Sequence, residues 1–160
     1  MNSKNKFLFF LSLVLIVITT SCQKENVIVQ KSKSELLTGT RWQLEILLYE
    51  QPPGSPAVNF TSALFLPCET DDIYQFKQDG SFVSSANTII CNPAHTDMFT
   101  YYNGGGWNLS KGDTLDFTAG FSKQTFLLTS ISTTSLELKQ TLIDYFQSEF
   151  VYRFKFKATP

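Results

Sequence analysis

Hydrophobic and polar side chains alternate with a period of two through most of the chain after Arg41. In the last such run, aromatic side chains occupy one face and mostly basic side chains the other. The aromatic positions are Phe150, Tyr152, Phe154 and Phe156, and the opposite positions are Val151, Arg153, Lys155 and Lys157. A period of two is typical of a β-strand with one buried face. This pattern predicts a protein built from strands.

Short runs of this kind follow one another along the chain, separated by turns rich in Gly, Asp and Ser. The runs are 42–49, 59–66, 73–77, 81–84, 107–109, 114–117, 125–131, 135–141 and 150–157. Three pairs of runs are joined by short turns, which is typical of β-hairpins. Ser34–Leu37 predicts one helical turn, and residues 92–103 predict a long loop. In the first strand we expect Trp42, Leu44, Ile46 and Leu48 to share a face.

Eight or nine sequential antiparallel strands can form a closed up-and-down barrel or a two-sheet sandwich. Consecutive hairpins favour the barrel, since sandwiches typically use long crossing connections. Closure also removes the exposed edges of such apolar strands. We therefore predict an all-β protein with an eight- to nine-stranded antiparallel up-and-down barrel, preceded by a short helical turn.

The chain starts with a segment that has the layout of an export signal. Lys4 and Lys6 precede an apolar run at 7–18, and small polar residues then lead to Cys22. This layout resembles the signal and lipobox of bacterial lipoproteins, in which the cysteine is acylated and becomes the first residue. The resemblance implies a signal peptide at 1–21 and a lipid, such as palmitate, on Cys22. An uncleaved transmembrane anchor is the alternative, but the run is short of the roughly 20 residues that a spanning helix needs.

Removal of the signal leaves 139 residues with 11 basic and 14 acidic side chains. We expect residues 22–33 to be a tether and residues 34–160 to be one domain with its own core. Basic residues are sparse and form no patch, which argues against nucleic-acid binding. We expect a monomer attached to the outer membrane through its lipid, and the sequence leaves open whether it faces the periplasm or the cell surface.

Cys68 and Cys91 are the cysteines that remain after Cys22, and an oxidising compartment favours their pairing. Asp79-Gly80 lies between two alternating runs, which predicts a two-residue hairpin turn. In that register residues 78 and 81 pair, and so do Cys68 and Cys91 if the strands continue without a bulge. We predict a disulfide. A metal site is the alternative, but two thiols and a distant histidine fall short of four ligands.

Catalytic chemistry is sparse. The single histidine, His95, lies in a predicted loop without a nucleophile motif nearby. Gly104–Gly106 lacks the lysine and spacing of a phosphate-binding loop. Glu69, Asp71 and Asp72 form an acidic cluster that we interpret as a solvated turn, because calcium needs six to eight oxygen ligands. We expect no enzymatic activity, no metal and no cofactor.

Aromatic side chains dominate the predicted inner face. An eight-stranded barrel is either just filled by side chains or holds one small ligand. If it holds a ligand, the candidate ligand-binding residues are Trp42, Tyr74, Phe76, Trp107, Phe117 and Phe154. The hydroxyl of Tyr74 would then be the polar contact in an apolar pocket. A solidly packed core is the alternative, and the sequence leaves both open.

Several short motifs resemble the lipocalin-like domains of bacterial lipoproteins. They are Gly39-Thr40-Arg41-Trp42, Asp71-Asp72, Tyr74-Gln75-Phe76, Asp79-Gly80-Ser81-Phe82, the cysteine pair and Gly105-Gly106-Trp107. The resemblance implies an eight-stranded barrel and, by analogy, a small hydrophobic ligand. We therefore expect a lipid-anchored protein that binds such a ligand. The alternative is a filled barrel that acts as an interaction module, contacting a protein or glycan through the loops 52–59 and 92–103.

Overall fold

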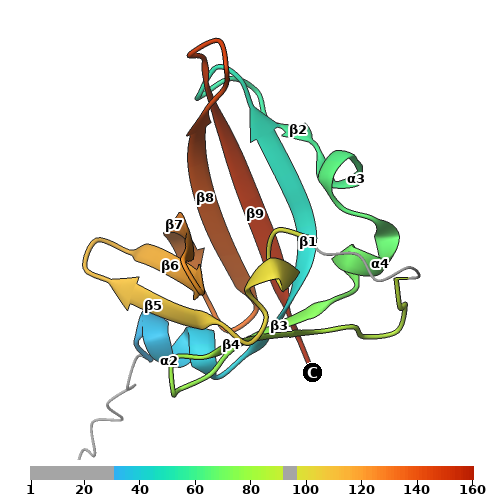
Figure 1. The fold of residues 1–160 in the computed structure, drawn as a ribbon, viewed down its shortest axis with the longest axis vertical. Coiled ribbons are helices and arrows are strands. Elements are labelled where there is room, and N and C mark those ends of the chain that lie inside the picture. Colours follow the sequence, from blue (N-terminus) through green and yellow to red (C-terminus); the bar gives the residue numbers. More distant parts are fainter. Residues whose placement is uncertain (1–30, 92–96) are drawn as a thin grey trace, which may run out of the picture. The chain divides into compact units, whose positions relative to one another are not determined.

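A computed structural model describes residues 31–91 and 97–160 of the chain (Figure 1). The predicted signal peptide, Cys22, most of the predicted tether and His95 lie outside the described residues. None of the helices in the two described ranges is long and apolar enough to cross a membrane.

The described chain is mostly β, as predicted. Its strands are β1 (Arg41–Glu50), β2 (Val58–Asn59), β3 (Ile73–Phe76), β4 (Phe82–Ser85), β5 (Gly106–Ser110), β6 (Thr114–Ala119), β7 (Ser122–Ile131), β8 (Ser135–Ile143) and β9 (Glu149–Thr159). The helices are α2 (Lys33–Thr38), α3 (Thr61–Leu64), α4 (Pro67–Thr70) and the 3₁₀ helix η1 (Thr100–Tyr102). Helix α2 confirms the predicted helical turn, and it starts at a capping box formed by Ser32 and Glu35.

All nine strands belong to one antiparallel sheet. Its order is β4-β3-β1-β9-β8-β7-β6-β5, and β2 pairs with β1 beside this path. The long strands β1, β9 and β8 lie at its centre (Figure 1). The three predicted hairpins are confirmed as β3–β4, β5–β6 and β7–β8.

The sheet is not closed by a continuous ladder. Its two end strands approach each other at one isolated bridge, between Ser81 and Gly106, and Phe82 N donates to Gly105 O at 2.9 Å. Gly105 itself lies against β6, where a Cβ would come within 2.1 Å of the carbonyl oxygen of Thr118, so this position needs glycine. The structure therefore confirms the antiparallel β class but not the predicted barrel.

A β-bulge in β1 corrects the predicted facing of the first strand. The register with β9 shifts between Leu44 and Ile46, so Glu45 is an extra residue. Beyond the bulge the alternation changes phase: Leu47 is fully buried, whereas Ile46 and Leu48 are only partly buried. The expectation that Ile46 and Leu48 face inward with Trp42 was wrong for this reason.

The run at 59–66 is another correction, because it forms the two-residue strand β2 and then helix α3 instead of a long strand. The Asn59 side chain accepts hydrogen bonds from the backbone N and the hydroxyl of Thr61, at 3.0 and 2.8 Å. An asparagine that bonds to the backbone two residues on turns the chain and competes with strand pairing.

The disulfide between Cys68 and Cys91 is present, with 5.3 Å between its Cα atoms. The predicted reason was wrong, however. Phe76 pairs with Phe82, one residue out of the predicted register, because Gly80 adopts a positive φ in a three-residue turn. Cys68 lies in α4 and Cys91 outside the strands, so helix geometry and not strand register brings them together.

The carboxylate of Asp71 fixes the segment that leads to Cys91. It accepts hydrogen bonds from the backbone N of Thr88 and Ile89 at 2.6 and 2.7 Å. These bonds lower the pKa of Asp71, with Ile89 making the largest contribution. The disulfide and these bonds together hold the β3–β4 hairpin and its continuation against α4.

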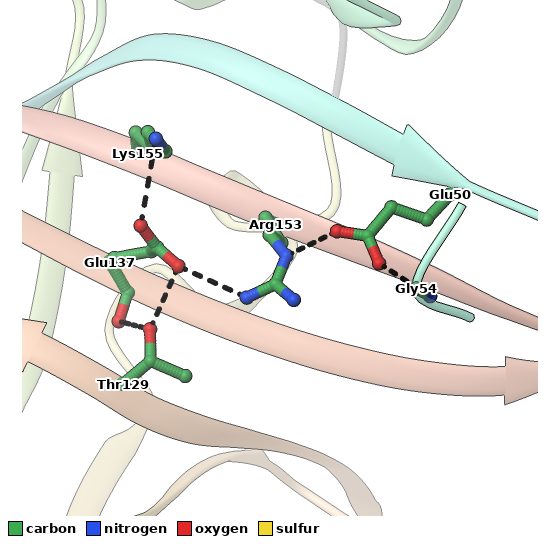
Figure 2. Close-up of polar contacts among 6 residues, drawn as sticks. All are labelled: Glu50, Gly54, Thr129, Glu137, Arg153 and Lys155. Atoms are coloured by element: carbon green, nitrogen blue, oxygen red, sulfur yellow. Dashed lines mark hydrogen bonds and ion pairs between the residues drawn. The ribbon is translucent and has the colours of Figure 1, made fainter. Parts of the chain in front are cut away.

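Charged side chains form a network on the outer face of the central strands (Figure 2). The guanidinium of Arg153 donates to Glu50 at 2.5 Å and to Glu137 at 3.4 Å. Glu137 also accepts from the hydroxyl of Thr129 at 3.0 Å and lies 3.7 Å from the ammonium of Lys155. The outward position of Arg153 agrees with its place in the alternation. Trp42 is buried in the core, where its indole N–H donates to Leu37 O at 3.3 Å.

We predict that Arg153→Met destabilises the protein by about 1–3 kcal/mol, between the values for exposed and buried ion pairs. The variant leaves the buried Glu50 carboxylate with the backbone N–H of Gly54 as its remaining hydrogen-bond donor. Arg153, and to a smaller extent Gly54, lower the pKa of Glu50. The stabilisation is therefore present above the unfolded pKa and disappears as the pH falls through the lower folded value.

Urea unfolding of both proteins at pH 7 and at acidic pH measures this difference. Lys155→Met is the matched control, since Lys155 is only partly buried and its ion pair is long, and it should change the stability by less than about 0.5 kcal/mol. Equal effects of the two substitutions at pH 7 would contradict the prediction.

Candidate functional site

The residues predicted to bind a ligand lie in a packed core. Trp42, Tyr74, Phe76, Phe117 and Phe154 are buried. Trp107 packs against this core from its margin. The first four of the buried residues line an internal space of about 10 Å³. Such a space holds one water molecule at most and has no room for a small hydrophobic ligand.

Phe99 accounts for this packing, and sequence reasoning missed it. Its side chain is 1% exposed and contacts rings from several strands. Ring centroids of Phe154, Tyr74 and Phe126 lie 5.2, 5.4 and 5.6 Å from that of Phe99. Phe99 comes from residues 92–103, which we predicted to be a long loop and which contact a partner only in the alternative hypothesis. Instead, the end of that segment fills the concave face of the sheet.

Asp97 positions Phe99. One oxygen of its carboxylate accepts hydrogen bonds from the backbone N of Phe99 and Thr100, at 2.5 and 2.8 Å. An aspartate followed by an aromatic residue two positions later was the available sequence signal for this turn. The other oxygen accepts from the Tyr74 hydroxyl at 3.3 Å. The predicted polar contact of Tyr74 with a ligand is thus made within the protein.

The acidic cluster beside Cys68 is not the solvated turn that we expected. Glu69 is 1% exposed and Asp72 is 9% exposed, and both approach the buried Asp97. Burial, and then the charges of Asp97, Glu69 and Asp71, raise the pKa of Asp72 to about 6. Burial also raises the pKa of Asp97. In the described ranges, no group of three or more His, Cys, Asp or Glu side chains is placed to hold a metal ion.

We predict that Asp72→Asn stabilises the protein at pH 7 by about 1–3 kcal/mol, because one unit of pKa corresponds to about 1.4 kcal/mol. The folded protein binds a proton at Asp72 below about pH 6, whereas the unfolded chain binds it only near pH 4. Wild-type stability should therefore fall as the pH rises from 4 towards 7, and the variant should show a smaller slope.

Thermal unfolding across this pH range measures the slope. Asp79→Asn is the control of opposite sign, since hydrogen bonds from Ser81 lower the pKa of this exposed carboxylate. A wild-type protein whose stability rises with pH between 4 and 6, and is unchanged by Asp72→Asn, would contradict the prediction.

A cleft lies between β7 and β8. The two strands pair from Ile131↔Leu136 to Leu127↔Lys139, and the ladder ends there. Beyond this point β7 pairs with β6, and β8 pairs with β9. Figure 1 shows β8 and β9 continuing past the strands β6 and β7. The cleft between the separated strands has a volume of about 540 Å³.

Polar, basic and apolar side chains share the walls of this cleft. The lining residues are Thr114, Lys123, Gln124, Thr125, Phe126, Leu127, Lys139, Gln140, Thr141 and Leu142. No carboxylate is among them. Lys123 forms an ion pair with Asp116 at 3.0 Å, and the described part of the chain provides no ion pair for Lys139. The cleft therefore carries a positive charge.

Gln140 is the most informative residue of the cleft. Its side chain continues the inner face of β8 after Leu136 and Leu138, and it is 7% exposed. The amide nitrogen donates to Thr125 O across the cleft at 3.4 Å. The amide oxygen is buried and has no hydrogen-bond partner within the two described ranges. A buried acceptor without a partner costs about 1–3 kcal/mol.

The backbone edges of the two strands also face the cleft. Successive residues of an antiparallel strand direct their N–H and C=O groups to opposite sides. Leu128 N donates to Asp113 O on the β6 side, so Thr125 directs its groups towards the cleft. On β8, Lys139 pairs with Leu127, so Thr141 directs its groups towards the same cleft. No strand of the described chain pairs with these edges.

Four partly buried aromatic residues extend the inner face beyond Phe154. They are Tyr49, Phe60, Phe150 and Tyr152. The ring centroids of Tyr49 and Phe60 lie 5.1 Å apart, and those of Phe150 and Tyr152 lie 5.3 Å apart. Tyr152 is also the cross-strand partner of Gln140. One side of Gln140 therefore adjoins apolar surface and the other adjoins the cleft.

In comparisons with known proteins, no family model and no curated protein matched this chain. The residues predicted as ligand-binding form the core, and the cleft is built from residues that the sequence did not single out. A glutamine at an inward position of β8, where the alternation calls for an apolar residue, was the signal that could have found it.

We predict that Gln140→Leu raises the stability by about 1 kcal/mol, because removal of a buried acceptor without a partner outweighs the loss of the long hydrogen bond, 3.4 Å, to Thr125 O. Denaturant unfolding measures the change. Gln43→Leu is the comparison. The amide of Gln43 donates a hydrogen bond to Thr70 O, so this substitution should lower the stability. A loss of stability in Gln140→Leu would show that this amide serves the fold and would contradict its assignment to a binding site.

Proposed function

We propose that this protein is a non-catalytic recognition module, held at the outer membrane by a lipid on Cys22, that binds its partner in the cleft between β7 and β8. This corresponds to the filled interaction module, and not to the carrier of a small hydrophobic ligand. It is a monomer of lipocalin-like architecture whose interior is occupied by its own side chains. The signal segment and the motifs that resemble lipocalin-like lipoproteins support the location and the architecture.

The main support for this proposal is the difference in volume between the internal space of the core and the cleft between β7 and β8. The internal space measures about 10 Å³ and the cleft about 540 Å³. A pocket for a small molecule typically measures about 300–1,000 Å³ and combines apolar walls with a few polar groups. The cleft is of this size, but lysine, glutamine and threonine side chains make up most of its lining, which suits a polar partner and not an apolar molecule. It also holds Gln140, whose buried amide oxygen lacks a partner in the described chain. Removal of such an oxygen from water is compensated when a partner donates a hydrogen bond to it.

Mass spectrometry of the full chain recovered from its membrane tests this function. Under denaturing conditions we expect a chain that begins at Cys22 and carries covalent acyl groups, because acylation survives denaturation. Under native conditions we expect no additional mass from an apolar small molecule, because the interior has no room for one. The Cys22→Ala variant is the matched control and should lack the acyl mass.

Two results would contradict the proposal. A native mass that exceeds the denatured mass by one small lipid-like molecule would restore the carrier hypothesis. A chain without acyl groups that still contains residues 1–21 would remove the lipid anchor.

A further inference from the structure

We infer that the partner segment in the cleft is an extended, acidic stretch of polypeptide that pairs with the free edge of β8. This inference rests on the proposed function and names its partner class. The segment takes the place that β7 leaves when the ladder ends at Leu127↔Lys139. Addition of a strand to an exposed sheet edge is a general mode of peptide recognition.

The backbone of β8 provides the first argument. Thr141 directs its N–H and C=O groups into the cleft, and the alternation places those of Ile143 on the same side. Both residues pair with β9 through the register Thr141↔Val151 and Ile143↔Glu149, so the strand is held straight by its other neighbour. A partner strand at about 4.8 Å would satisfy these groups without any change in the ladder between β8 and β9.

Gln140 provides the second argument. Its side chain reaches Thr125 O across the cleft, and its buried amide oxygen accepts no hydrogen bond from the described residues. A peptide brings backbone N–H donors at regular intervals along β8, so one of them can reach this oxygen. A hydrophobic ligand offers no donor, and its binding would leave the oxygen without a partner.

Charge provides the third argument and decides the side chains of the segment. Lys139 lies on the β8 wall of the cleft, and Lys123 lies on the β7 wall, where it is already paired with Asp116. Because no carboxylate lines the cleft, an acidic side chain of the segment would meet a complementary charge there. Side chains alternate along a strand. If the acidic residues of the bound segment lie on the outer face, its remaining residues face Phe126 and Leu142 and should be apolar.

Nuclear magnetic resonance of the full chain in detergent micelles, titrated with defined peptides, tests this inference. The probe is a short synthetic peptide that alternates valine with glutamate. We expect its addition to shift the amide signals of residues 123–127 and 139–143 and to slow hydrogen exchange at Thr141. The same peptide with alternate backbone amides methylated should bind at least about tenfold more weakly, because a strand pairs through those amides.

Variants of the protein separate the three arguments. Thr141→Pro removes the N–H that faces the cleft and should abolish binding, while unchanged β8–β9 signals report that the fold is intact. Lys139→Gln should weaken binding by about two- to fivefold, as expected for a partly exposed ion pair. Lys111→Gln, in an exposed turn between β5 and β6, is the matched charge control and should leave the affinity unchanged.

The outcomes distinguish this inference from the proposed function. If an acidic oligosaccharide shifts the signals of the cleft and the peptide does not, the peptide inference fails and the recognition function stands. If the methylated peptide binds as well as the unmodified one, pairing with β8 is excluded. If neither probe shifts the cleft and Gln140→Leu destabilises the fold, both the inference and the proposed function fail.

Discussion

The packing of Phe99 against the concave face of the sheet is the contact on which the rest of the structure depends. A curved antiparallel sheet with aromatic inner positions needs a filling element when its ladder does not close. Phe99 provides it, in contact with the rings of Tyr74, Phe126 and Phe154. Large rings of this kind each bury about 150–250 Å² and dominate the energy of a core. The core therefore forms around a side chain that comes from a loop.

The packing of Phe99 requires the burial of a carboxylate, which is unfavourable. Asp97 must be buried to hold the turn of Phe99, and it approaches Glu69 and Asp72 below the same surface. Burial raises the pKa of Asp72 and of Asp97, and the charges of neighbouring carboxylates add to the rise. Hydrogen bonds to Asp97 form the turn at Phe99. The neighbouring Asp72 has its pKa raised to about 6 as a result of burial and nearby negative charge. The disulfide between Cys68 and Cys91 lies in the same region and limits its opening.

The filled interior also decides where binding can occur. The core ends where Phe126 and Leu138 give way to Gln140 on the inner face, and there β7 and β8 separate. If the β7–β8 ladder continued, the edges of these two strands would be paired, and if the apolar core continued, an apolar side chain would stand at position 140. Both interruptions fall at the same place. On the outer face, Arg153 and Glu137 keep the central strands together, so that the opening of the sheet stays local.

The sequence by itself determined the class of the protein and most of its strands, because alternation and turn residues are local signals. The helical turn at α2, the hairpin β5–β6 and the outward position of Arg153 depend on residues that are neighbours in the chain. The tertiary structure alone decided the bulge at Glu45, the burial of Phe99 and the end of the ladder at Lys139. Each of these depends on how side chains from distant segments pack together in the core. A repeating pattern of polar and apolar residues does not show how much space their packing leaves.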